Sequence, residues 1–77
     1  MSDVKRWTVL VDIDEYDGCI RAVARLRTGD NDRAVGTGMA RLDPAEREGP
    51  PIGGELATAR ALSELSYRLL NAVTQGL

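Results

Sequence analysis

Several residue types that commonly stabilise a small domain or build a reactive site are scarce in this sequence. Its 77 residues contain no His and no Phe, and Cys19 is the only cysteine. These counts exclude a disulfide within the 77 residues and the usual zinc sites, which use His and several Cys ligands. Domains of this size rarely gain more than ~3–5 kcal/mol from one core without such supports. We therefore expect one domain over residues 1–77, with no metal or cofactor, stabilised by association into a homodimer.

The sequence also lacks a large excess of charge of one sign and lacks long apolar runs. The net charge is −2 and the sequence pI is about 5.0, so the chain as a whole is not an electrostatic ligand for nucleic acid or for an anionic membrane. No apolar run approaches the ~20 residues of a membrane span, and the N-terminal MSDVKRW lacks the apolar stretch of a signal peptide. Together with a lone thiol, this predicts a cytoplasmic protein with no membrane contact.

What is present is alternation of apolar and polar residues in three segments, 5–13, 19–27 and 33–42, as expected of strands. In the first, one face carries Trp7, Val9, Val11 and Ile13 and should be buried. Turns rich in Asp, Asn and Gly follow at 14–18 and 28–32. Because these connections are short, neighbouring strands should pair antiparallel.

Residues 55–74 predict one long helix. Its expected core face has apolar residues at steps of three and four, namely Leu56, Ala59, Leu62, Leu65, Leu69 and Val73. The opposite face carries Arg60, Glu64, Arg68 and Asn71. Gly36, Gly38 and Ala40 form a smooth strip on the third strand, where a helix can approach the backbone closely. The sequence thus predicts an α+β domain, a three-stranded antiparallel β-meander with one C-terminal α-helix packed on one face.

The sheet face away from the helix is the candidate interaction face, with Arg21, Val23, Arg25, Arg27, Arg33, Val35, Met39 and Arg41. Arg and Met are enriched at subunit interfaces, which favours self-association. An arginine-rich face is also suited to the phosphates of nucleic acid. The less specific interpretation is a solvated surface whose arginines pair with Asp12, Asp30 and Asp32.

No group of residues predicts catalysis. The acidic turn at Asp12, Asp14, Glu15 and Asp17 is a poor match to a calcium loop. Cys19, Ser63 and Ser66 lack a His base. An enzyme would require a pocket formed between subunits.

The runs RAVARLR, VGTGMARLDPA and IGGELATARALSEL resemble a family of small uncharacterised actinobacterial proteins. The resemblance implies a fold similar to the double-stranded RNA-binding domain (dsRBD-like), no established activity and no catalytic residues. True domains of that type bind phosphates through lysines at the start of the final helix. The matching positions here are Gly54, Glu55 and Thr58, so the usual mode of duplex RNA binding is not expected.

The preferred function is therefore a small cytoplasmic interaction or regulatory module that is homodimeric and non-catalytic. The alternative is a nucleic-acid-binding module that uses the arginine-rich face. The third hypothesis is an enzyme with its site at a subunit interface.

Overall fold

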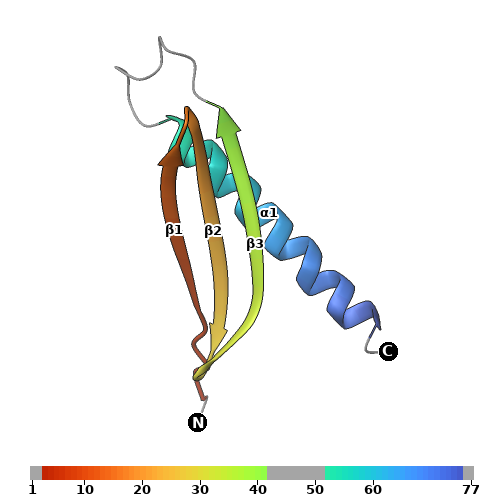
Figure 1. The fold of residues 1–77 in the computed structure, drawn as a ribbon. Coiled ribbons are helices and arrows are strands. Elements are labelled where there is room, and N and C mark those ends of the chain that lie inside the picture. The colour runs from red at the N-terminus through yellow and green to blue at the C-terminus, as the bar shows by residue number, and fades with distance from the viewer. Residues whose placement is uncertain (1–2, 42–51, 76–77) are drawn as a thin grey trace.

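The computed structural model of the protein describes residues 3–41 and 52–75. Three strands, β1 (Thr8–Tyr16), β2 (Cys19–Thr28) and β3 (Asn31–Arg41), form one sheet in the order β1-β2-β3 with antiparallel pairing. One helix, α1 (Ile52–Gln75), lies across one face of this sheet (Figure 1). The predicted α+β meander with one C-terminal helix is confirmed. The last residue of the predicted third strand, Leu42, lies outside the described residues.

The first hairpin turn explains why β1 extends further than predicted. Asp17 and Gly18 have φ angles of 55° and 75°, the two consecutive positive values of a type I′ turn, whose twist matches that of paired strands. This turn needs only two residues, so the chain from Asp14 to Tyr16 continues the strand instead of forming a loop. In the second hairpin, Gly29 supplies the positive φ, 66°.

The contact between β3 and α1 is a contact between backbones. A Cβ atom added at Gly36 would lie 2.8 Å from Leu65 Cα, and one added at Gly38 would lie 2.7 Å from Arg60 Cβ and also against the carbonyl oxygen of Ala57. Any side chain at either position would therefore collide with the helix. This confirms the prediction that the glycine strip of the third strand receives the helix.

Small residues dominate the core that results. Among residues 3–41 and 52–75, eight hydrophobic residues are buried, and five of them are alanines: Ile20, Ala22, Ala24, Leu26, Ala40, Ala57, Ala61 and Leu65. The helix thus turns Ala57 and Ala61 toward the sheet, because only small side chains fit where its backbone touches glycine. The predicted core face of the helix is therefore correct only for Leu65, which is buried, and Leu69, which packs against the core. Leu56 and Leu62 are each 42% exposed, and Val73 is 66% exposed.

The first strand is also less covered than its pattern predicts. Val9, Val11 and Ile13 pair with buried residues of β2, so they lie on the helix side of the sheet as expected. However, α1 crosses the sheet diagonally, and its C-terminal end lies beyond the edge formed by β3 (Figure 1). Ile13, at the β1 edge, is 54% exposed because α1 packs on β2 and β3 and barely on β1. Trp7, which precedes the strand, is 55% exposed. The prediction of a buried Trp7 face is wrong for this reason.

Candidate interaction faces

The sheet face opposite α1 carries the predicted interaction residues in rows across the strands. Leu10, Arg25 and Val35 are aligned in one such row. Val23 and Val35 are half-buried, whereas Met39 is 53% exposed. All five of the predicted arginines are exposed: Arg21, Arg25, Arg27, Arg33 and Arg41. This open face thus brings together most of the predicted set, with its aliphatic members partly shielded.

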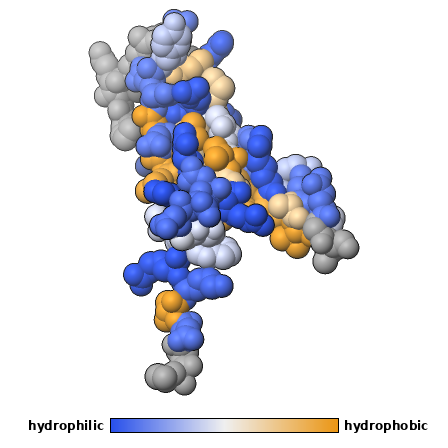
Figure 2. Space-filling model, turned by 60° about the horizontal axis from the view of Figure 1, so that its bottom comes forward, coloured by the Kyte–Doolittle hydropathy of each residue, from blue (hydrophilic) through white to orange (hydrophobic). Residues whose placement is uncertain are grey.

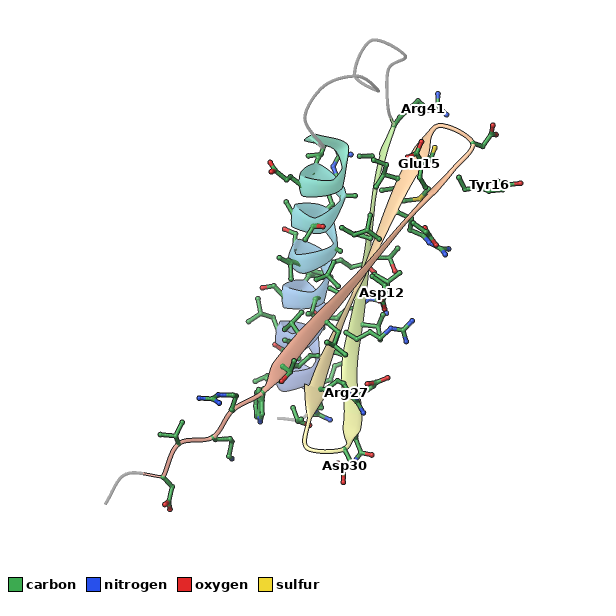
Figure 3. All side chains as sticks on the ribbon, turned by 90° about the vertical axis from the view of Figure 1, so that its left-hand side faces the viewer. Asp12, Glu15, Tyr16, Arg27, Asp30 and Arg41 are labelled. Carbon is green, nitrogen blue, oxygen red and sulfur yellow. The ribbon has the colours of Figure 1, made fainter. Side chains whose placement is uncertain are left out.

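The arginines of the open face are spread over the length of the sheet. In the edge-on view of Figure 3, Arg41 and Tyr16 lie at one end, whereas Arg27 and Asp30 lie at the other (Figure 3). Asp12 lies between them, on the side away from the helix. The positive charges therefore form no single cluster, and carboxylates separate them.

Ion pairs neutralise part of this charge. Arg21 donates a hydrogen bond from Nη2 to Asp14 Oδ2 at 3.0 Å, and Arg27 Nε lies 3.4 Å from Asp32 Oδ1. The pairing of Arg27 with Asp32 is one that the sequence predicted. Arg21 pairs instead with Asp14, which was not among the predicted partners. Exposed pairs of this kind contribute at most ~1 kcal/mol each. Their main effect is to weaken the positive field of the face.

Arg33 lies apart from the other arginines because of an irregularity in the sheet. The register shifts between Leu26 and Arg27, so that Leu26 pairs with Ala34 while Arg27 pairs with Asp32. Arg33 is the extra residue of this bulge. It lines a hollow of about 300 Å³ at the β3 edge, together with Ala34, Val35, Arg68, Leu69, Asn71, Ala72 and Gln75.

A hollow of about 430 Å³ lies at the first hairpin, lined by Asp14, Tyr16, Asp17, Cys19, Arg21, Met39 and Arg41. It contains the Cys19 thiol and two of the four carboxylates of the acidic turn, Asp14 and Asp17. Asp14 is held in the ion pair with Arg21. Among residues 3–41 and 52–75, no group of three or more His, Cys, Asp or Glu is arranged to hold a metal ion.

A second face, not predicted from the sequence, is a groove that begins between Ile13 of β1 and α1 and follows α1; it is called the β1–α1 groove below. One part has a volume of about 430 Å³ and is lined by Ile13, Gly54, Glu55, Thr58, Ala59 and Leu62. A further hollow of about 340 Å³ continues along the helix and shares Leu62, with Leu65, Ser66, Leu69, Leu70 and Val73. Glu55 is the one ionisable residue in these two linings. Hydrophobic side chains also reach the surface between sheet and helix and near the end of the helix in Figure 2 (Figure 2).

The β1–α1 groove could have been found from one signal in the sequence. A strand with glycine at alternate positions accepts only small residues from a helix packed on it. Ala57 and Ala61 satisfy this requirement at a spacing of four, whereas Leu56 and Leu62 do not. Assigning the alanines to the contact turns Leu62 sideways, toward Ile13 of β1.

The fold defines a class of protein: a small α+β domain with one helix on one face of an open three-stranded antiparallel sheet. The chain belongs to the Rv2632c-like family, whose model matches residues 5–77. It is similar to an uncharacterized protein of Mycobacterium bovis, Mb1767, with 49% identity over 96% of this chain and 78% of the relative. It also resembles the uncharacterized Mycobacterium tuberculosis protein Rv2632c, with 51% identity over 74% of this chain and 60% of the relative.

A solved structure supports the fold assignment. The crystal structure of Rv2632c superposes with a TM-score of 0.82 at 41% sequence identity, covering 97% of this chain and 88% of that one. The predicted membership of a small actinobacterial family is thus confirmed by mycobacterial relatives. The further likeness to double-stranded RNA-binding domains stays a prediction.

Across the described part of the chain, no helix has the length and apolarity needed to span a membrane.

Proposed function

We propose that this protein is a small, non-catalytic interaction or regulatory module that works as a homodimer in the cytoplasm. One observation carries the proposal: large apolar side chains are outside while small ones fill the core. Ile13, Leu70 and Val73 are each more than half exposed, whereas five of the eight buried core residues are alanines. Apolar surface of this extent is typical of a protein that buries it against a partner.

The number of exposed apolar side chains supports the same proposal. Among residues 3–41 and 52–75, twelve large hydrophobic residues are at least 42% exposed. Apolar surface of this kind is commonly buried against a partner. A cytoplasmic location agrees with Cys19, which is a half-buried free thiol.

Sedimentation equilibrium over a concentration range of about 1 to 100 μM tests the homodimer, together with thermal unfolding at the same concentrations. We expect a mass of twice 8.3 kDa and a melting temperature that rises with protein concentration, because dissociation accompanies unfolding. A monomeric mass throughout, with a concentration-independent melting temperature, would refute the homodimer.

Nucleic-acid binding by the open face is the second candidate. It is favoured by the exposure of Arg25, which no carboxylate pairs with among the described residues, at the centre of that face. It is weakened by the two ion pairs and by the absence of aromatic residues beside Arg25 on which bases could stack. A fluorescence-anisotropy titration with duplex RNA, single-stranded RNA and duplex DNA at two salt concentrations separates the candidates. Micromolar binding that falls steeply with salt and is lost in Arg25→Glu would favour this candidate.

An enzyme is the third candidate. The hollow at the first hairpin would have to be completed by a partner subunit that brings a general base to Cys19 or to a carboxylate. Labelling of Cys19 by iodoacetamide at the rate of an ordinary free thiol would argue against this candidate, because a catalytic thiol reacts faster when a base activates it.

A further inference from the structure

We infer that the second copy of the chain docks in the β1–α1 groove, with the two-fold axis of the dimer passing close to Ser66. This inference rests on the proposed homodimer and specifies its geometry. It moves the interface from the open face of the sheet, where the sequence pattern placed it, to the opposite side of the molecule.

The chemistry of the groove favours an apolar partner. Its two parts are contiguous through Leu62, and their linings contain seven aliphatic residues: Ile13, Ala59, Leu62, Leu65, Leu69, Leu70 and Val73. The single acid, Glu55, lies in the first turn of the helix, at one end of the groove. A charged or phosphorylated partner would find no cation in these linings. A second copy offers the same apolar surface, and a two-fold axis makes such a surface complementary to itself.

The spacing of residues along the helix specifies how two copies can meet. Leu62, Ser66, Leu69 and Val73 follow one another at steps of four, three and four residues. This repeat is the pattern of helices packed side by side at a shallow angle. Ser66 is the small residue within the stripe and is exposed, so two helices can approach closely there. With antiparallel helices and the axis at Ser66, Leu62 of one protomer faces Leu70 of its partner.

The available area agrees with this arrangement. Five large residues on the helix side of the sheet or in the groove are each at least 42% exposed: Val9, Ile13, Leu62, Leu70 and Val73. Their exposed area is on the order of 500 Å², which is within the range of the largest apolar patch of a monomer and can form the apolar centre of the ~800 Å² that a standard interface takes from each partner. On the open face, by contrast, Val23 and Val35 are already half-buried. Two copies joined through that face would also bring together arginines of like charge.

The test is a pair of cysteine variants in a Cys19→Ser background. Helices packed through a small residue lie ~8–10 Å apart, and Cα atoms lie ~2.3 Å from each axis, so facing Ser66 Cα atoms should be about 3.5–5.5 Å apart. That distance is within or just below the range that a disulfide spans. Ser66→Cys should therefore form a covalent dimer on mild oxidation. Met39→Cys, which is on the open face, should stay uncross-linked under the same conditions.

A second pair of variants tests the interface without a disulfide. Leu70→Glu places a charge in the groove, whereas Tyr67→Glu places one at a matched site, since the two residues are 64% and 66% exposed and Tyr67 is not among the groove residues. We expect the first to raise the dimer dissociation constant by at least tenfold and the second to leave it within threefold, by sedimentation. Circular dichroism confirms that both variants fold.

The outcomes separate the inference from the proposed function. A monomeric wild-type protein would overturn both. If the wild-type protein is a dimer but the Met39→Cys variant cross-links, or the Leu70→Glu variant dimerises as tightly as the wild type, the inferred geometry is overturned and the homodimer stands.

Discussion

Replacing Gly38 by alanine tests the closest contact between the sheet and the helix. The new Cβ would meet the carbonyl oxygen of Ala57, the amide nitrogen of Ala61 and, at 2.7 Å, the Cβ of Arg60. Overpacking costs ~1–3 kcal/mol, and the upper part of this range applies because backbone atoms cannot rotate away. Replacing glycine within a strand recovers about 0.5–1 kcal/mol. We therefore expect a net loss of about 2 kcal/mol.

That loss is measurable in a domain of this size. A change of 2 kcal/mol corresponds to a melting temperature lower by about 8–16 °C, followed by circular dichroism at a fixed protein concentration. Gly54→Ala is the matched control, because its nearest atom, Ile13 Cδ1, lies 4.0 Å away. Since Gly54 lies within α1, this control should be neutral or stabilising by up to about 1 kcal/mol. A Gly38→Ala variant as stable as the wild type would refute the close approach of helix and strand.

Two further predictions concern how the helix is oriented and held. Leu65→Ala should lower the free energy of unfolding by about 2–5 kcal/mol because Leu65 is buried, whereas Leu56→Ala should cost less than about 1 kcal/mol. Equal losses in chemical denaturation would mean that the helix has another rotation about its axis. Arg60 Nη1 donates a hydrogen bond to the Met39 carbonyl oxygen at 2.7 Å. Arg60→Ala should therefore cost about 1 kcal/mol and Arg60→Lys less, and an unchanged midpoint in both would contradict a role for this bond.

The strands and turns could be predicted from sequence because each rests on local chemistry. Alternation fixes which side of a strand faces the helix, and this assignment is correct for Val9 and Ile13. Asp17-Gly18 selects a two-residue turn through its tolerance of positive φ. The strip at Gly36 and Gly38 is a local signal too, because glycine weakens a strand and often marks a site where another backbone approaches closely.

The rotation of the helix could not be found by maximising its apolar face. The most apolar side of α1 includes Leu62 and Val73, whereas the side that fits against glycine includes Ala57 and Ala61. The predicted rotation of α1 about its axis differs from the observed one by roughly one residue, or about 100°. Glu64 pairs with Arg68, at 2.9 Å, as the four-residue spacing suggests, but Arg60 binds the backbone of β3 instead.

Two parts of the candidate site depend on features with no local signature. The bulge that places Arg33 at the β3 edge arises from the pairing of two strands, and a single strand does not encode it. The exposure of Trp7 depends on the diagonal course of the helix across the sheet. Both follow from how elements meet, which periodicity within one element does not describe.

A flat surface offers little resistance to a helix that moves along its own axis. The centre of the sheet under α1 is a plateau made of small residues from two strands, Ala22, Ala24, Gly36 and Gly38. Such a surface has no protruding side chains to resist motion along the helix axis. Larger residues stand at its two ends, Ile20 and Leu26, both buried. We therefore expect the axial position of the helix to depend on these two residues and on the hydrogen bond from Arg60 to the Met39 carbonyl oxygen.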